Sequence, residues 1–459
     1  MPRRRSRISA SIVLGGVLLG GIGGSAAASD WTTFGHDVAH TNSVPHSGGL
    51  TPNRVAKLRM RWRTKLGAVS DTQPAYASKV PVGSRRLDLV FAGTEHGRVV
   101  AAIAATGHVL WHRDFPDTYS ACWENTPDSR FGITATPIVD RAHNRLLVIP
   151  GDNAVHALSL STGDEERGWP VKLGFDPKTH HVWGSPTLTG SRLYVPIASY
   201  CDRGRYRGAL AFLSMRKRRV SRRWFVVGES VSGGGIWGWG GAPVDLSNGN
   251  VYVTTGNATS GQEDIDYAEH LVRLSADLEV IEANEPYFGP FTKEDADFAS
   301  APLLLRPKGC PPLVAAIHKY GELFVYRRHA VADGPVQTIA APGGTGTFAW
   351  SPRTQTLYAT GDARGLVALR ASGCLLHQTW AVKPTKPMWA PSPPTVAGGV
   401  VYFGTGRAAS LIAVRAGDGR VLWRSGKSIQ GSVYAAPTAI EGKVFAVSWD
   451  EHMYAFDAP

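Results

Sequence analysis

Short apolar runs, rather than long amphipathic stretches, dominate the chain beyond its N-terminal region. Eight of these runs share one form, in which an apolar strand rich in small residues leads to a turn at Gly or Asp and often to a Trp. They are Val99–Ile103, Ala154–Leu158, Gly208–Phe212, His270–Leu274, Leu323–Tyr326, Leu366–Leu369, Leu411–Val414 and Met453–Phe456. Because each run is too short for a helix and is bounded by turn residues, each is predicted to be a β-strand.

The spacing of the runs predicts the fold. Equivalent positions within them are 55, 54, 62, 52, 43, 45 and 42 residues apart, and these positions are Ala102, Ala157, Ala211, Arg273, Val325, Ala368, Ala413 and Ala455. Periods of about 40–50 residues built of short strands are typical of β-propellers. Another β-rich run precedes each copy, as at Leu89–Thr94, and a further upstream strand begins at a Pro, as at Pro137. We therefore predict an all-β, eight-bladed propeller with four strands per blade.

The two ends of the chain are expected to close this ring. The eighth run lies close to Pro459 and has no Trp-bearing strand after it, whereas Leu58–Trp62 is a strand-like segment without a neighbour. Pairing these segments would remove an exposed sheet edge. The alternative, an open solenoid, would leave both ends uncovered. Residues 29–459 are accordingly expected to form a single domain.

Residues 1–28 have the composition of an export signal. A basic segment (Arg3–Arg7) precedes a glycine-rich, weakly apolar core (Ile8–Gly24) and three small residues, Ala26–Ala28, that fit a cleavage site. A membrane anchor is the alternative, but the run is short for a span and glycine weakens it. We expect a secreted or periplasmic protein without stable membrane insertion, and the export route stays open.

The cysteine count agrees with an oxidising compartment, because the chain has four cysteines, an even number. Of the three possible pairings we favour Cys122–Cys201 and Cys310–Cys374, since each pair would link neighbouring blades. The net charge of +12 includes the arginines of the signal segment. The basic cluster Arg216–Arg223 is expected to be a solvated hairpin rather than a nucleic-acid site. His180–His181 could bind a metal, but a surface turn is the favoured interpretation.

Several motifs resemble one family. Asp30–Asp37 is similar to the W-x-x-x-G-x-D start of mature quinoproteins, and the repeat A-h-D-x-x-T-G-x-x-h-W is strongest at Ala101–Trp111 and Ala413–Trp423. The chain therefore resembles the pyrroloquinoline-quinone (PQQ) repeat propellers, which include methanol, alcohol and polyvinyl-alcohol dehydrogenases. Gly132–Pro137, together with the preceding Cys122, looks closest to the polyvinyl-alcohol branch.

The stretch Gly233–Asp245 resembles the segment that supplies the Trp floor beneath PQQ. The resemblance places Trp239 at the floor position and Trp237 beside it, and Gly234 and Gly235 would let a flat cofactor approach. Another Trp packed between blades is the structural alternative. The strand ending in Thr255-Gly256-Asn257 matches a family motif whose Asn is a calcium ligand, which implies a calcium-binding role for Asn257.

Three further residues follow from the resemblance. Asp295, in Glu294–Phe298, takes the position of the catalytic base and of a further metal ligand, although Glu294 replaces the family's Trp. Lys319 takes the position of a cation that contacts the quinone oxygens. The family's calcium-binding Glu has no counterpart in register, and Asp202, one residue out of step, is the available substitute.

The resemblance implies an exported PQQ-dependent alcohol dehydrogenase, in which hydride passes from a small or polymeric alcohol to PQQ with the help of calcium and an Asp base. Because the chain has no haem-binding CxxCH motif, a separate electron acceptor is implied. The alternative is a non-catalytic propeller that acts outside the cytoplasm as a scaffold or ligand-binding module, because repeats alone indicate a fold. The sequence leaves open whether the protein is an enzyme.

Overall fold

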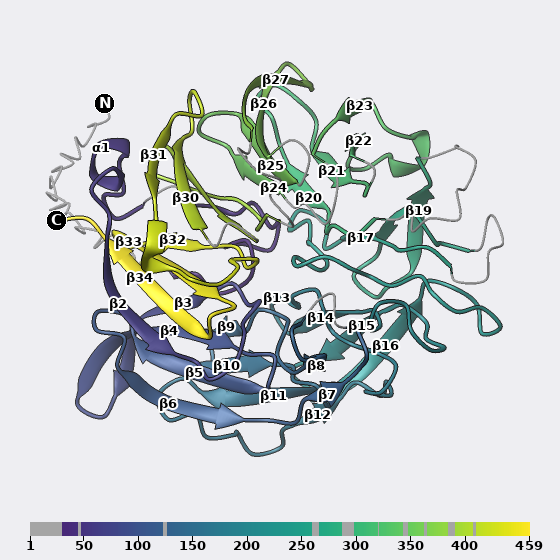
Figure 1. Cartoon of the computed structure of the whole chain (residues 1–459). Helices are drawn as coiled ribbons and strands as arrows, with labels where there is room; N and C mark the ends of the chain where they lie inside the picture. Colours follow the sequence, from purple (N-terminus) through teal and green to yellow (C-terminus); the bar gives the residue numbers. More distant parts are fainter. Residues whose placement is uncertain are drawn as a thin grey trace, which may run out of the picture.

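The chain forms a ring of eight β-sheet blades around a central axis, as the computed structural model shows (Figure 1). The structure describes residues 30–44, 47–122, 126–258, 266–286, 298–319, 321–342, 348–361, 365–383, 391–406 and 410–459. Neighbouring strands within each blade are antiparallel, and inner strands of successive blades contact one another, as β20 (Leu303–Leu305) does β24 (Phe348–Ser351). The predicted all-β, eight-bladed fold is confirmed.

The strands are given from the axis outward for each blade. Blade 1 contains β3 (Ala75–Val82), β4 (Arg85–Gly93), β5 (Arg98–Ile103) and β6 (Val109–Asp114). Blade 2 contains β9 (Ile138–Asp140), β10 (Arg145–Val148), β11 (Ala154–Ser159) and β12 (Val171–Lys172). Blade 3 contains β13 (Thr187–Thr189), β14 (Arg192–Ile197), β15 (Ala209–Ser214) and β16 (Arg219–Phe225). Blade 4 contains β17 (Val251–Thr254), β18 (Leu271–Leu274) and β19 (Val280–Asn284).

The remaining blades follow the same order. Blade 5 contains β20, β21 (Leu313–Ile317), β22 (Glu322–Arg327) and β23 (Gln337–Ala340). Blade 6 contains β24, β25 (Thr356–Gly361), β26 (Gly365–Ser372) and β27 (Leu375–Val382). Blade 7 contains β28 (Thr395–Ala397), β29 (Val400–Thr405), β30 (Ser410–Arg415) and β31 (Val421–Arg424). Blade 8 contains β32 (Thr438–Ile440), β33 (Lys443–Ser448), β34 (His452–Asp457) and β2 (Arg59–Lys65).

The minor elements lie between or beside the blades. They are β1 (Ser43–Val44), α1 (Pro52–Val55), the ribbon β7 (Thr118–Tyr119) with β8 (Arg130–Phe131), and the 3-10 turns η1 (Val331–Asp333) and η2 (Gly426–Ser428). β1 adds to blade 7 by parallel pairing with β28. Blade 4 differs from the prediction of four strands, because a single bridge between Val244 and Val251 stands at its inner position within the described residues. The Gly-rich run before Pro243 disfavours a regular strand there.

Glycine and tryptophan join neighbouring blades. The Trp62 ring lies against Gly107 of the next blade, and Trp111 lies in the same way against Gly163, where an added Cβ would fall 2.6 Å from the ring. The indole of Trp62 also donates to the carbonyl of Ala104 (3.1 Å). Only a residue without a side chain admits so close a ring, so the predicted packing of Trp between blades is confirmed.

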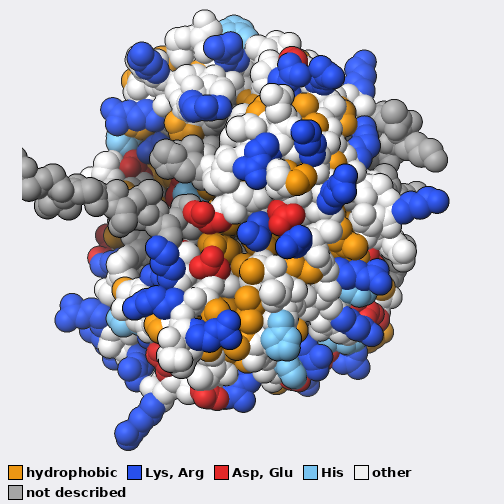
Figure 2. All heavy atoms as spheres, turned by 90° about the vertical axis from the view of Figure 1, so that its left-hand side faces the viewer, with side chains coloured by type: hydrophobic (Ala, Val, Ile, Leu, Met, Phe, Trp, Pro, Cys, Tyr) orange, Lys and Arg blue, Asp and Glu red, His pale blue; other side chains and the backbone are white. Residues whose placement is uncertain are grey.

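The predicted closure is confirmed as well. β2 pairs with β34 in antiparallel register, with Arg59 opposite Asp457 and Lys65 opposite His452. The N-terminal strand thus completes the last blade. It is also strongly basic, since four of its seven residues are Arg or Lys with exposed side chains. Figure 2 shows that Lys and Arg are spread over this side of the molecule rather than gathered in one patch.

The segment from Trp31 to Asn42, dark purple in Figure 1, lies inside the ring. Its carbonyl groups accept hydrogen bonds from inner-strand amides of six blades, and the donors are Tyr76, Val139, Val244, Leu304, Trp350 and Val396. His40 reaches blade 3 through a 3.2 Å contact between its Nε2 and Thr187 Oγ1. We refer to Trp31–Asn42 as the axial segment. It occupies the centre that a ring of blades would otherwise leave open.

Two disulfides join separate parts of the ring. Cys122 is bonded to Cys201 and Cys310 to Cys374, with Cα–Cα distances of 5.9 and 5.4 Å. Both predicted pairs are confirmed, and the second links blades 5 and 6. Over the described part of the chain, helices are too short and too polar to cross a membrane.

Candidate functional site

The predicted site residues that the structure describes fall on one face of the ring. Strands alternate in direction within a blade, so the connections between blades emerge at the same end as the hairpins between second and third strands. We call this end the upper face. It carries the segment Val226–Ala242 between blades 3 and 4, the hairpin after β14 that contains Asp202, and Asn257 after β17. Trp237, Trp239 and Asn257 therefore reach the same end of the ring.

The glycine run is held between two blades by backbone hydrogen bonds. Gly208 of blade 3 donates to the carbonyl of Gly233 (2.8 Å), and Gly234 donates to the carbonyl of Asn257 in blade 4 (2.8 Å). A Cβ on Gly208 would fall 1.6 Å from the oxygen of Gly234. This approach explains the glycines physically, because a side chain at Gly208 would separate the two segments.

Three tryptophans meet on this segment. The Trp183 ring lies 6.2 Å from that of Trp237 and 6.5 Å from that of Trp239, at interplanar angles of 55° and 72°. The Trp237 ring covers Gly235, where a Cβ would fall 2.5 Å from it, and its Nε1 is buried without a hydrogen-bond partner in the described residues. An unpaired buried indole N–H is costly, so this donor is available to a ligand.

The side chain of Asn257 offers a buried hydrogen-bond acceptor, in contrast to the buried donor of Trp237. Its Oδ1 is buried and accepts no hydrogen bond from any described residue. Its backbone carbonyl binds Gly234, and Gly256 beside it donates to the carbonyl of Gly235 (2.7 Å). A carboxamide oxygen left in this state is a hard donor suited to a cation such as calcium.

Asp202 lies on the opposite flank of the glycine run. It follows the disulfide-bonded Cys201, has a left-handed backbone (φ 53°), and accepts a hydrogen bond from the hydroxyl of Tyr206. The Tyr206 ring lies 6.4 Å from the Trp237 ring. The backbone carbonyl of Tyr206 accepts a hydrogen bond from the amide of Gly233 (3.0 Å). Asp202 and Asn257 thus flank the same backbone segment. The described residues contain no group of three or more His, Cys, Asp or Glu side chains that could hold a metal ion.

The other two predicted residues are placed less fully. Lys319 follows β21. Two residues before Lys319, the carbonyl of Ile317 accepts a hydrogen bond from Ser300 Oγ (2.8 Å). Ser300 in turn lies against Gly238, where a Cβ would fall 2.8 Å from the Ser300 carbonyl carbon. The backbone of Lys319 therefore belongs to the same face. Asp295 lies outside the described residues, so its role as a base stays a prediction.

The axial segment forms the floor beneath this face. The backbone N–H of Gly35 donates to Gln73 Oε1 (2.9 Å), and the backbone N–H of Gln73 donates to Thr136 Oγ1 (3.0 Å). The chain of bonds continues from the Thr136 amide to Ser185 Oγ (3.0 Å) and from the Ser185 amide to the carbonyl of Trp239 (2.9 Å). Four consecutive inner-strand starts are thereby tied to the Trp239 backbone, so the floor is a fixed platform.

Sequence reasoning missed a polar network on the upper face, formed by Asp71, Glu95, Thr134 and His181. All four are buried. The expectation of a surface turn at His180–His181 is wrong, because the backbone of His181 pairs with Ala198 and its ring stacks on Tyr200. Burial also lowers the pKa of His181 to about 3, so the imidazole is neutral.

Comparisons with known proteins agree with this architecture. Residues 332–459 match a PQQ-repeat family model described as outer membrane protein assembly factor BamB. Among solved structures, quinohemoprotein alcohol dehydrogenase from Comamonas testosteroni superposes with a TM-score of 0.70 at 16% identity, covering 94% of this chain and 80% of that one. The chain is an eight-bladed β-propeller, and its C-terminal part is similar to the PQQ-repeat family.

Two more solved structures show the range of this fold. A europium-containing methanol dehydrogenase has a TM-score of 0.71 at 13% identity, covering 94% of this chain and 98% of its own. BamB from Moraxella catarrhalis has a TM-score of 0.59 at 12% identity, covering 87% and 99%. No curated protein sequence matches this chain significantly. At these identities the likeness establishes the fold alone, and the site has to be argued from its own residues.

Proposed function

We propose that this propeller is an exported quinoprotein dehydrogenase that oxidises an alcohol on its upper face. The observation that carries the proposal is the unpaired Asn257 Oδ1 beside the clamped glycines and the unpaired Trp237 Nε1. A buried acceptor and a buried donor that have no partner among the described residues indicate a site for a polar ligand, which would complete both hydrogen bonds. The names of the similar structures, alcohol and methanol dehydrogenases, give the same direction.

The residues present fit the two groups that the fold family uses. Asn257 would bind calcium through its carboxamide oxygen, with Asp202 and Asp295 as further oxygen ligands. Trp237 and Trp239 would supply aromatic faces for a planar quinone, and Lys319 a positive charge for its oxygens. When bound, PQQ supplies hydride acceptance, and calcium polarises the quinone carbonyl.

The chain's own contribution is to orient the substrate and to move its proton. Asp295 would accept the alcohol proton as the base. The Gln73–Thr136–Ser185 platform would keep water from approaching the site from below, because the axial segment fills that side. Two disulfides suit an oxidising compartment, in agreement with the signal segment at residues 1–28, and electrons would leave to a separate acceptor.

The test is binding of PQQ by the purified protein with calcium, measured by equilibrium dialysis and by the absorbance of bound quinone. We expect binding that EDTA removes and calcium restores, and reduction of a dye with primary alcohols or polyvinyl alcohol. Asn257→Ala should lose calcium-dependent binding, whereas Asn248→Ala, on the opposite face, should retain it. If PQQ does not bind with calcium present, the proposal is wrong.

A second candidate is a non-catalytic propeller that binds other proteins outside the cytoplasm. It is favoured by one observation, the match of residues 332–459 to the BamB family model. It predicts that neither PQQ nor calcium binds, so the same dialysis experiment separates the two candidates.

A further inference from the structure

Asp71 and Glu95 form a buried carboxyl pair on the upper face without a cation. Their side chains belong to residues that are 3% and 0% exposed, and neither forms an ion pair with a described Lys, Arg or His. Asp71 Oδ1 accepts the indole N–H of Trp449 (2.8 Å). Glu95 Oε2 accepts the amide of Gly132 (3.2 Å) and the hydroxyl of Thr134 (2.8 Å). Neutral donors alone therefore surround both groups.

The pair is expected to hold a proton. Burial and then the charge of Asp71 raise the pKa of Glu95 well above its usual range, and burial raises the pKa of Asp71 to about 7. Glu95 Oε1 is buried with no donor directed at it. The backbone N–H of Glu95 donates to the carbonyl of Val69 (2.9 Å), two residues before Asp71, and this bond brings the two acids together. A proton on Glu95 Oε1, donated to Asp71, satisfies both groups, because two neighbouring buried carboxyl groups cannot both be charged.

Thr134 links the pair to the aromatic side of the site. Its hydroxyl donates to Glu95, so its oxygen accepts from His181 Nε2, which lies 2.7 Å away. His181 must then carry its proton on Nε2, and its buried Nδ1, which has no partner among the described residues, is an acceptor. The His181 ring lies 5.3 Å from that of Trp183, which contacts Trp237 and Trp239.

We propose that Asp71 and Glu95 share one proton and that Thr134 and His181 connect this pair to the tryptophan-lined site as a proton relay. A proton arriving at His181 Nδ1 displaces the Nε2 proton to Thr134, whose hydroxyl proton passes to Glu95 Oε2. The proton on Glu95 Oε1 then passes to Asp71. One proton enters and one is held by Asp71, no bond to carbon changes, and His181 ends neutral.

The proposal rests on the proposed function, because alcohol oxidation supplies the proton. Two further titratable groups face the relay. The charge of Asp128 raises the pKa of Glu95, and Asp128 contacts His96 (2.5 Å), both side chains being nearly half exposed. Tyr200 stacks on His181 and donates to the carbonyl of Pro177 (2.9 Å).

The first experiment needs no cofactor. Infrared spectra of the protein should show the carbonyl stretch of a protonated carboxyl group at pH 7, and replacing both acids, Asp71→Asn together with Glu95→Gln, should remove the band. In Asp71→Asn the band should stay but shift in frequency, because Glu95 then donates to an amide. Asp418→Asn, an exposed acid, is the control and should leave the band unchanged. Absence of the band from the wild-type protein at pH 7 would overturn the shared proton.

The second experiment tests the relay in the PQQ-loaded protein. Thr134→Val removes the hydroxyl at nearly constant volume, and it should lower kcat roughly tenfold and change the pH profile, less than the loss of a direct acid or base. Thr134→Ser keeps the hydroxyl and should restore both. If PQQ binding and turnover occur but the pH profile is identical in all three proteins, the relay is wrong and the proposed function stands. If PQQ fails to bind, both are wrong.

Discussion

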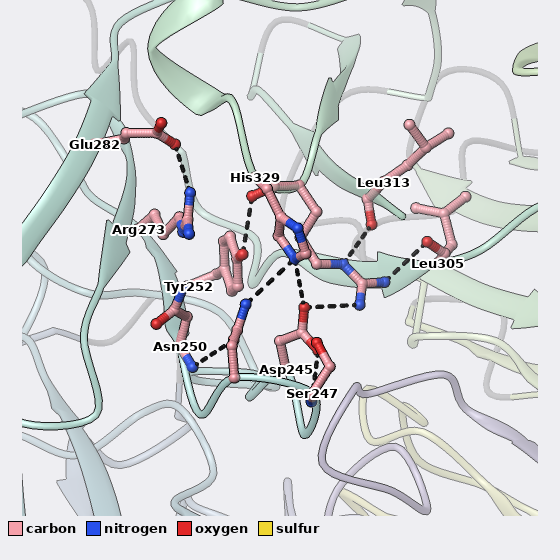
Figure 3. Close-up of polar contacts among 11 residues, drawn as sticks. Asp245, Ser247, Asn250, Tyr252, Arg273, Glu282, Leu305, Leu313 and His329 are labelled. Carbon is pink, nitrogen blue, oxygen red and sulfur yellow. Dashed lines mark hydrogen bonds and ion pairs between the residues drawn. The ribbon is translucent and has the colours of Figure 1, made fainter. Parts of the chain in front are cut away.

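Both faces of the ring carry buried carboxyl groups, but the groups on the two faces differ in protonation. On the lower face, Asp245 follows the inner position of blade 4, and Figure 3 shows it between Ser247 and His329. Its Oδ2 lies 3.2 Å from Arg328 Nη1 and 3.0 Å from His329 Nε2 of blade 5, and Ser247 Oγ donates to Oδ1 (2.7 Å). Asp71 and Glu95 on the upper face have no such cations among the described residues, and Asp71 Oδ1 accepts the neutral indole N–H of Trp449 instead.

The difference decides the protonation of each group. Burial acts to raise the pKa of Asp245, but hydrogen bonds from His329 and Ser247 and the charge of Arg328 outweigh it, so this pKa falls below its ordinary value. For Asp71 and Glu95 burial prevails. The lower-face acid is therefore a fixed anion that joins two blades, and the upper-face pair keeps a proton that chemistry can use.

The largest effect is expected at the lower face. Asp245→Ala leaves Arg328 buried without its anion, since the other contacts of Arg328 are the carbonyl groups of Leu305 and Leu313. Loss of one partner of a buried pair costs about 3–5 kcal/mol. Chemical denaturation should show this loss. Asp418→Asn, which breaks an exposed pair with Arg415, should cost less than about 1 kcal/mol and is the control.

A smaller effect of opposite sign is expected at the upper face. The pKa of Asp71 is raised to about 7 in the folded protein, so the folded state binds the proton more tightly than the unfolded state. This group's contribution to stability is therefore present at low pH and is lost as pH rises from about 4 through about 7. Asp71→Asn should be more stable than the wild type at pH 8 by about 1–3 kcal/mol.

The measurement is the difference in unfolding free energy between Asp71→Asn and the wild type from pH 5 to pH 8. The difference removes the contribution of neutral buried histidines such as His40 and His181, which act in the opposite direction in both proteins. A difference that does not vary with pH would contradict an acid raised by burial.

Lowering the pH should test the charge of Asp245 on the lower face, and the expected change in stability is smaller. Because the folded pKa of Asp245 is depressed, its stabilisation is present above its ordinary pKa, about 4, and is lost as pH falls below that value. The stability difference between wild type and Asp245→Asn should therefore be constant from pH 7 to about pH 4 and shrink on further acidification. A difference that already shrinks between pH 7 and pH 5 would show that Asp245 is not the paired anion described.

The smallest effect on stability is expected at Asn257. Its Oδ1 has no partner among the described residues, so Asn257→Ala should change the unfolding free energy of the ligand-free protein by less than about 0.5 kcal/mol. The same variant should abolish stabilisation by calcium with PQQ in a thermal-shift assay. A large loss of stability without ligand would assign Asn257 a structural role instead.

The repeats predicted most of the fold because they are local patterns. Seven of the eight marker positions lie in the third strand of their blade, from Ala102 in β5 to Ala455 in β34, and Arg273 lies in β18, the middle strand of the three-stranded blade 4. Ring closure followed from a segment that lacked a neighbour, and the disulfide pairing followed from the choice that links neighbouring blades. The widest gap, 62 residues between Ala211 and Arg273, contains the glycine run, but the spacing alone could not show that this run replaces a regular inner strand of blade 4 by a single bridge.

The site was only partly predictable. Motif resemblance gave Trp237 and Asn257, and backbone hydrogen bonds join the segment of Trp237 to that of Asn257. It could not give Glu95 or His181, because a Glu in a hairpin and a His before a strand have no distinctive spacing. The roles of Glu95 and His181 depend on contacts between neighbouring blades. Their hydrogen bonds with Thr134 join residues 39 and 47 positions apart.

The axial segment also bears on how the chain folds. Trp31–Asn42 bonds to inner strands as distant in sequence as Val396, and β2 pairs with β34 at the other end of the chain. None of these partners exists until most of the blades have been made, and such long-range contacts form slowly because closing the loops costs entropy. We therefore expect Trp31–Asn42, although it lies near the N-terminus of the chain, to be among the last segments to take its native place.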